Sequence, residues 1–214
     1  MIQRRHLLLA SALSSVTGLT YAAEPYVAGK HYFNVVPPVR TSANQIEVFL
    51  FFAYFCPHCI QFEPIVQEWA KTLPKDVVLR VCPVAWRPSM LPFTQAYFAL
   101  EALDLHDKLH MKFFESVVYQ ERPYDLNNGT ADIRGFMVDN GVDGALWDKT
   151  MNSFSVHNKA RQASMTWQMN GIDSTPSVGV AGLYTTGPHL VGTRRGTLDC
   201  LNYLIDKARK ERKA

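Results

Sequence analysis

The sequence predicts a protein of mixed α/β class in which a block of helices interrupts the strands. The first observation is the order of the apolar patterns, because strand-like segments occur on both sides of residues 87–171, where only helical patterns occur. The second is composition: 47% of the 214 residues are hydrophobic and 19% are charged, which favours a packed core over disorder. The predicted order is β-β-α-β, the helical block, and β-β-α.

Three segments ahead of the helical block have the character of strands. Residues 31–36 predict a first edge strand, which two prolines end. Residues 45–53 form the strongest candidate, because they are apolar on both faces from Val48 onward, as is typical of a central strand. Residues 77–84 predict a second strand of the core.

A helix is predicted over residues 57–73, directly after the central strand. Its apolar residues recur at helical spacing, and Pro57 suits the first turn. Pro64 lies inside this helix, removes the hydrogen bond to the carbonyl of Ile60 and is expected to kink it.

Helical patterns fill the block, and strand signals return after it. The helices are predicted over residues 91–103, 107–119, 131–140, 143–151 and 156–169. After the block, a strand is predicted over residues 177–181 and a turn region over residues 182–187. A short strand is predicted over residues 189–191, and a C-terminal helix over residues 197–214.

Two cysteines flank a Pro-His pair where the central strand meets the first helix. Cys56 is placed at or just before the first helical position, where its sulfur faces unpaired N–H groups and the positive end of the helix dipole. Both stabilise a thiolate, so the pKa of Cys56 is expected to be lowered, and His58 adds to this effect. Cys59, one turn into the helix, is expected to be buried and slow to react. The Cys56-Pro57-His58-Cys59 stretch therefore predicts a dithiol that switches between reduced and disulfide forms.

A zinc site is an alternative interpretation of the cysteine pair. Cys82 and Cys200 would have to supply its other half, but they have no paired spacing of their own. A Pro-His pair between two cysteines is typical of redox motifs. We therefore expect no metal and no cofactor.

Cys82 and Cys200 have two interpretations that the sequence leaves open. Single buried free cysteines are the common case. An oxidising compartment and the even number of cysteines favour a second disulfide, Cys82–Cys200, instead. The choice depends on a Cα separation that a sequence does not define.

The two ends of the chain carry an export signal and most of the basic excess. Residues 1–22 combine Arg4 and Arg5 with a short apolar stretch and small residues, which predicts a signal peptide cleaved after Ala22. An ordinary secretory signal is favoured, although Arg4-Arg5 also loosely fits a twin-arginine signal. The net charge is +3, but the interior has no basic stripe, which argues against nucleic acid as a partner.

The active-site stretch resembles that of the DsbA family of periplasmic thiol:disulfide oxidases. The likeness rests on Phe55 to Cys59 followed by Gln61-Phe62-Glu63, on the position and length of the helical block, and on Thr175-Pro176, which falls where thioredoxin folds place a cis-proline loop. It covers essentially the whole mature chain. The resemblance implies a thioredoxin-like fold with an inserted all-helical domain, in which residues 23–86 and 172–214 form the thioredoxin-like domain and residues 87–171 the insertion.

The resemblance also implies an enzyme, its partners and its compartment. We expect a periplasmic, monomeric oxidase that transfers the Cys56–Cys59 disulfide to reduced or unfolded exported proteins through a mixed disulfide at Cys56. A DsbB-type membrane quinone reductase would reoxidise it. A disulfide isomerase or reductase on the same fold is the nearest alternative, and a non-catalytic periplasmic metal-binding protein is another.

Two positions depart from the best-known members of the family. Thr175 stands where Val is frequent in the enteric oxidases, and its hydroxyl is a candidate hydrogen-bond donor to a cysteine sulfur. Leu50 stands where those members commonly have a buried Glu near the inner cysteine. Glu63 then remains as a candidate for proton transfer with Cys59, and a solvated helix residue is the equal alternative.

Client proteins need an apolar surface near the cysteines. If Pro176 is cis, the backbone beside it is expected to pair with an extended substrate segment. The residues expected to expose apolar area around the site are Tyr54, Phe55, Trp86 and Met90.

Overall fold

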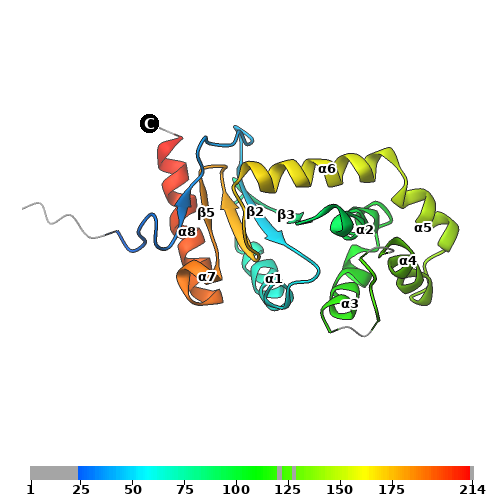
Figure 1. Ribbon diagram of the computed structural model, residues 1–214. Helices are drawn as coiled ribbons and strands as arrows, with labels where there is room; N and C mark the ends of the chain where they lie inside the picture. Colours follow the sequence, from blue (N-terminus) through cyan, green and yellow to red (C-terminus); the bar gives the residue numbers. More distant parts are fainter. Residues whose placement is uncertain (1–23, 120–121, 127–128, 213–214) are drawn as a thin grey trace, which may run out of the picture.

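The computed structural model describes residues 24–119, 122–126 and 129–212. Figure 1 shows a sheet with its covering helices at one end and a group of helices at the other. The predicted signal peptide, residues 1–22, lies outside the described residues.

The described strands form one five-stranded sheet in the order β1-β5-β4-β2-β3. β2 (Ile46–Phe52) pairs in parallel with β3 (Val77–Pro83) and antiparallel with β4 (Ser177–Val180). β5 (Tyr184–Thr186) pairs with β4, and the short β1 (Phe33–Asn34) forms the edge beside β5. The predicted central place of β2 is confirmed. Strands from before and after the helical block therefore pair directly with each other.

The period-two alternation of β2 sends its side chains to two different cores. Leu50 packs in a buried cluster with α1 (Pro57–Ala70) and α8 (Arg194–Glu211), which cover one face of the sheet. Phe51 points to the opposite face and joins a second cluster with side chains of α6 (Phe154–Met169). Both faces of β2 are buried, as its continuous apolar run predicted.

Between β3 and β4 the described chain is helical. Its elements are a 3-10 turn (Pro88–Met90), α2 (Leu91–Ala102), α3 (His106–Val118), α4 (Gly129–Asp139), α5 (Gly144–Met151) and α6. Each helix predicted within the block lies within two residues of its expected bounds. The domain boundaries, after residue 86 and after residue 171, stay a prediction.

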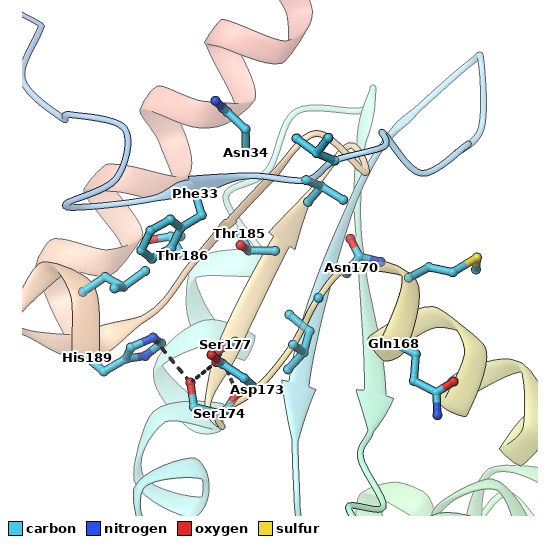
Figure 2. Close-up of a pocket in the computed structure, with 16 residues that line it drawn as sticks. Phe33, Asn34, Gln168, Asn170, Asp173, Ser174, Ser177, Thr185, Thr186 and His189 are labelled. Carbon is cyan, nitrogen blue, oxygen red and sulfur yellow. Dashed lines mark hydrogen bonds between the residues drawn. The ribbon is translucent and has the colours of Figure 1, made fainter.

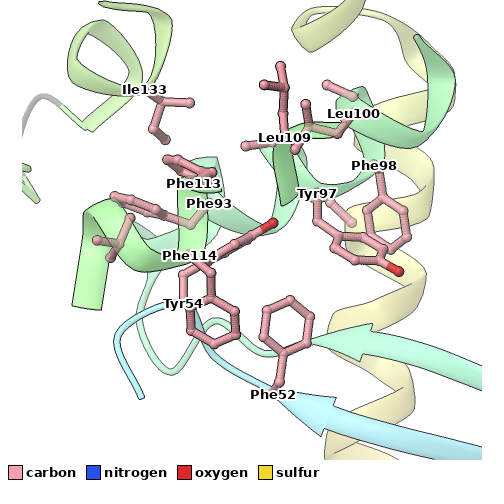
Figure 3. Packing of buried hydrophobic residues seen from close by; sticks show 14 of the residues in the cluster. Phe52, Tyr54, Phe93, Tyr97, Phe98, Leu100, Leu109, Phe113, Phe114 and Ile133 are labelled. Carbon is pink, nitrogen blue, oxygen red and sulfur yellow. The ribbon is translucent and has the colours of Figure 1, made fainter. Parts of the chain in front are cut away.

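Aromatic rings fill the junction between the helical block and the end of β2 (Figure 3). Phe52 lies 5.4 Å from Phe114 and 5.6 Å from Tyr97, measured between ring centroids. Tyr54 lies 4.7 Å from Phe113 in the same way. The segment that leads from β2 to the first helix therefore rests on side chains of α2 and α3.

Two predictions after the block were wrong. Residues 182–187, predicted as a turn, contain β5, whose aromatic and β-branched residues extend a hairpin from β4. Residues 189–191, predicted as a strand, belong to the short helix α7 (Pro188–Val191), because Pro188 takes the first helical position after Gly187.

The last helix also begins earlier than expected. α8 starts at Arg194 rather than at Thr197 because the Thr193 hydroxyl accepts a hydrogen bond of 2.9 Å from the backbone N–H of Gly196. Within the described ranges no helix has both the length and the apolar character that crossing a membrane requires.

Candidate active site around Cys56 and Cys59

Cys56 is the N-cap residue of α1. Its backbone is extended, and Pro57 follows at the first helical position. The sulfur of Cys56 accepts a hydrogen bond of 3.2 Å from the backbone N–H of Cys59. The thiol thus takes the place of the Ser, Thr or Asp side chain that usually caps a helix, and it faces the positive end of the helix dipole.

The pKa values of the two thiols are shifted in opposite directions. Hydrogen bonds from the Cys59 thiol, from the Thr175 side chain and from the backbone N–H groups of Cys59 and His58 outweigh burial and lower the pKa of Cys56 to about 6. Burial, followed by the hydrogen bond to Cys56, raises the pKa of Cys59 far above its ordinary value. Cys56 is half-buried, whereas Cys59 is 1% exposed. Of the two thiols, Cys56 is therefore both the more acidic and the more accessible one.

The loop before β4 lies against the nucleophile. The Thr175–Pro176 peptide bond is cis, as the resemblance predicted. The thiol of Cys56 donates a hydrogen bond of 3.3 Å to the Thr175 carbonyl, although the two residues are 119 positions apart in the sequence. The Thr175 side chain also hydrogen-bonds the sulfurs of both cysteines and lowers the pKa of each. The tertiary structure thus brings together the two parts of the predicted site, the Cys56–Cys59 motif and the Thr175-Pro176 loop.

A groove of about 890 Å³ runs beside the cysteines. His58 of α1 and the Thr175-Pro176 loop form one part of its lining. Pro188 of α7 and the guanidinium-bearing Arg194 at the start of α8 form another. An extended chain entering this groove would pass along the cis-proline loop and reach the half-buried sulfur of Cys56.

A second cavity of about 670 Å³ lies behind the same loop (Figure 2). Ser174 and His189 line both cavities. The Ser174 hydroxyl donates a hydrogen bond of 3.1 Å to Asp173 and lies 3.4 Å from Nε2 of His189. These contacts hold the cis-proline loop on the side away from Cys56.

Glu63 is buried, so the alternative of a solvated helix residue is wrong. It is 2% exposed, and its Oε1 lies 3.0 Å from Nε2 of His110 on α3. Nδ1 of His110 lies 2.8 Å from the hydroxyl of Tyr54. The sequence-based interpretation missed His110 and the polar role of Tyr54. The available signal was a histidine on the apolar stripe of α3 that Phe113 and Val117 continue.

Leu50 lies on the face of β2 that α1 and α8 cover. It belongs to the buried cluster with those helices and is 1% exposed. Its neighbours across the strands are Val81 and Val178. The position thus holds an apolar side chain among apolar side chains. Glu63 is left as the buried carboxylate on the helix that carries both cysteines.

Cys82 and Cys200 lie on different faces of the sheet, which contradicts the suggested second disulfide. Cys82 belongs to the cluster with α6, where its thiol points to the carbonyl of Ala163 at 3.5 Å. Cys200 on α8 belongs to the opposite cluster, 3.7 Å from the Thr186 hydroxyl. Each is a separate buried free thiol. In the part of the chain that the structure describes, no group of three or more His, Cys, Asp or Glu side chains is placed to bind a metal ion.

The expected apolar surface around the site is only partly present. Trp86 is 37% exposed and Phe55 is half-buried against Phe93. Tyr54 and Met90 are buried, so their assignment to the surface was wrong. Their rings and side chains pack into the helical block because the active-site segment rests on that block.

The chain is similar to DsbA proteins over almost its whole length. The thiol:disulfide interchange protein DsbA of Bordetella parapertussis is 38% identical over 206 residues, which cover 95% of this chain and 96% of that protein. The crystal structure of Pseudomonas aeruginosa DsbA matches with a TM-score of 0.80 and 29% identity, covering 90% of this chain and 99% of that chain. The oxidoreductase NmDsbA1 from Neisseria meningitidis matches with a TM-score of 0.76 and 28% identity, covering 88% of this chain and 96% of that chain. No protein-family model matches the sequence.

Proposed function

Because the chain belongs to the DsbA family of thiol:disulfide interchange proteins, it is an oxidoreductase, and we propose that it oxidises cysteine pairs of exported proteins. The observation that supports this proposal is that the pKa of Cys56 is lowered whereas the pKa of Cys59 is raised. A stabilised thiolate lowers the free energy of the reduced form. The disulfide form then becomes the stronger oxidant.

The proposed reaction begins at the half-buried sulfur. A substrate thiolate attacks Cys56, the Cys56–Cys59 bond breaks, and its electron pair leaves with Cys59. In the resulting mixed disulfide, a second substrate thiolate attacks the substrate sulfur bonded to Cys56. Cys56 leaves as a thiolate, which the hydrogen bonds at the start of α1 stabilise. The substrate has then lost two electrons and the enzyme has gained them.

Cys59 must gain a proton in the first step. Burial raises its pKa so far that a Cys59 thiolate is unstable at neutral pH. We assign the proton to Glu63, which follows Cys59 by four residues on α1 and therefore lies on the same face of that helix. The proton returns to Glu63 when the disulfide is remade.

The groove and the cis-proline loop provide the substrate site of this proposal. Thr175 and Pro176 both line the groove, and the Thr175 carbonyl accepts the hydrogen bond from the thiol of Cys56. The backbone of Thr175 is placed to pair with an extended segment of an unfolded client, as a strand pairs with a sheet edge. Pro57 and His58 shape the helix start that stabilises the thiolate.

We further propose that the protein is a periplasmic monomer and that a DsbB-type membrane quinone reductase reoxidises it. These proposals rest on the family and on the predicted signal in residues 1–22. N-terminal sequencing of the protein from a periplasmic fraction is expected to begin at Ala23. A chain that starts at Met1 and stays with the cytosolic fraction would contradict the predicted export.

The redox potential of the Cys56–Cys59 couple is the deciding measurement. Equilibration with glutathione buffers is expected to give a potential clearly above the about −270 mV of thioredoxin. Cys59→Ser serves as a companion variant, because it is expected to accumulate the mixed disulfide at Cys56. A potential close to −270 mV would overturn the oxidase assignment.

An isomerase or reductase on the same fold is the second candidate, and Thr175 is the residue that bears on the choice. The side chain of Thr175 hydrogen-bonds both sulfurs and so retunes the couple. Refolding of a reduced client and of a client with scrambled disulfides separates the two activities. The oxidase proposal requires fast oxidation of the reduced client and little activity on the scrambled one, and the reverse result would support the isomerase.

A further inference from the structure

A buried chain of three polar side chains joins the active-site helix to the helical block. Glu63 on α1, His110 on α3 and Tyr54, two residues before Cys56, are linked by contacts of 3.0 and 2.8 Å through the two ring nitrogens of His110. The side chains of His110 and Glu63 are each 3% exposed. Polar groups buried this deeply are costly unless each has a defined partner.

The donors and acceptors of this chain can be ordered in one consistent way. Burial, with the nearby Glu63, raises the pKa of Tyr54 well above its ordinary value, so the phenol keeps its proton and donates it to Nδ1 of His110. With Nδ1 acting as the acceptor, His110 donates from Nε2 to Oε1 of Glu63. Oε2 of Glu63 is buried and has no hydrogen-bond partner among the described residues.

The Glu63 end of this chain lies on the same helix face as Cys59. Glu63 is one helical turn from Cys59, which places their Cβ atoms about 5–6 Å apart. The sulfur of Cys59 also accepts a hydrogen bond from the backbone N–H of Ala53, the residue before Tyr54. The open oxygen of Glu63 is thus a buried acceptor on the same helix face as Cys59.

The walls around His110 contain few other ionisable groups. His106, one turn earlier on α3, stacks on it with 4.5 Å between centroids, and burial together with His110 lowers the pKa of His106. Tyr97 of α2 meets the ring edge-on at 5.5 Å, and Glu101 stands next to Tyr97 and pairs with Lys159. The rings of Phe52 and Phe114 also contact His110, with 5.6 and 5.9 Å between ring centroids. The ionisable groups that face His110 are therefore Tyr54, Glu63, His106 and Tyr97.

We propose that His110 is a positioning residue for the dithiol reaction, holding Glu63 so that its free oxygen exchanges the proton of Cys59. The inference rests on the proton role of Glu63 proposed above. When a substrate thiolate opens the disulfide, the electron pair goes to Cys59 and the proton of the Glu63 carboxyl follows it. The Nε2–H of His110 stabilises the carboxylate that remains. Through His110, the helical block affects the rate of the dithiol reaction, although no atom of the block forms or breaks a covalent bond in it.

The test measures proton exchange at Cys59 separately from formation of the thiolate at Cys56. The rate at which a small thiol reduces the enzyme disulfide is measured from pH 4 to 9 in wild type, His110→Leu, His110→Gln and Glu63→Gln. Alkylation of Cys56 in the reduced protein is followed over the same pH range. His157→Gln, which changes an exposed histidine on α6, is the matched control.

The expected result for His110→Leu is a loss of about tenfold in the reduction rate, below the about 10²-fold of a direct acid–base group, and an altered pH profile. The pH midpoint of Cys56 alkylation is expected to stay in place. His110→Gln should restore most of the rate, because its amide supplies both a donor and an acceptor. His157→Gln should match wild type.

An unchanged pH profile in folded His110→Leu would overturn the inference. If the Leu variant fails to fold, a folded His110→Gln that recovers neither the rate nor the pH profile of wild type would overturn it instead. Loss of thermal stability with all rates lowered in parallel would assign His110 a purely structural role. An unchanged profile in Glu63→Gln would remove the proton role of Glu63, on which the inference rests. A wild-type potential near that of thioredoxin would instead overturn the oxidase direction and leave the role of His110 standing.

Discussion

The two sulfurs of the active site differ because they occupy opposite ends of one helical turn. Cys56 caps the helix and gathers hydrogen bonds that favour its charged form. Cys59 points into the core, where burial disfavours charge. The lower pKa belongs to the more exposed sulfur, so the thiol that ionises more readily is also the accessible one.

Thr175→Val tests the contribution of one side chain to this difference. The Thr175 side chain lowers the pKa of Cys56, so its loss is expected to raise that pKa by about 1 unit, the value of one hydrogen bond to a charged group. The reduced form then loses stability, and the potential becomes more negative by about 30 mV. Absorbance of the thiolate near 240 nm and glutathione equilibration measure the two changes. Thr150→Val on α5 is the control, and a pKa of Cys56 that stays the same or falls would contradict the expectation.

The stability of the reduced protein should depend on pH through Cys56. Its pKa is about 6 in the folded chain, against an ordinary value of 9.0, so between these values the unfolded chain binds more protons. Stability therefore rises with pH from about 6 to about 9, and this gain is lost as the pH falls through 6. Above that window the raised pKa of Cys59 reverses the trend.

Urea unfolding of the reduced protein at several pH values measures this dependence. The lowered pKa of His106 acts in the same direction at acidic pH, so the comparison with Cys56→Ser isolates the thiol. The serine variant is expected to lose the rise between pH 6 and 9. An equal rise in both proteins would show that the thiolate does not contribute.

At the scale of the elements, the turn of the β4–β5 hairpin packs tightly against the segment that precedes β2. Ala181 and Gly182 both have positive φ, and the backbone of Val39 packs directly against Gly182. The N–H of Val39 donates a hydrogen bond of 2.9 Å to the Gly182 carbonyl. A side chain at position 182 has no room beside this backbone.

Gly182→Ala is expected to destabilise the protein by about 2 kcal/mol, because the left-handed backbone is strained and the added Cβ meets the carbonyl of Val39. Gly141→Ala is the matched control. Gly141 also has a positive φ, but nothing lies within 4 Å of the added Cβ, so only about 1 kcal/mol is expected. Thermal or urea unfolding gives both values. Equal costs in the two variants would show that the contact with Val39 is easily relieved.

At the scale of the whole molecule, the sheet separates two cores and keeps the remaining cysteines apart. Cys82 faces α6 on one side, and Cys200 lies on α8 on the other. Burial raises the pKa of Cys82 to about 12, which makes it a poor nucleophile. Accidental exchange between these thiols and the active-site disulfide is therefore disfavoured.

Thiol counting tests this arrangement. The oxidised protein, unfolded in denaturant without a reductant, is expected to give two free thiols per chain, and peptide mapping should assign them to Cys82 and Cys200. The fully reduced protein, expected to give four, is the control. No free thiol in the oxidised sample would establish a second disulfide and contradict the structure.

The sequence by itself determined the local parts of this protein. The Cys56–Cys59 motif at a strand end, the buried character of β2 and the helices of the block follow from spacing and periodicity, which act within a few turns. The same local reasoning failed after residue 181, where β5 and α7 are too short to show a period and form through pairing and a proline start.

Tertiary structure decided which distant residues meet. It brought Thr175 to Cys56, buried Glu63 against His110, and placed Cys82 and Cys200 on opposite faces of the sheet. None of these contacts has a signature in the spacing of residues. Each depends on how the helical block and the strands on either side of it pack around β2, and that packing is a property of the assembled core.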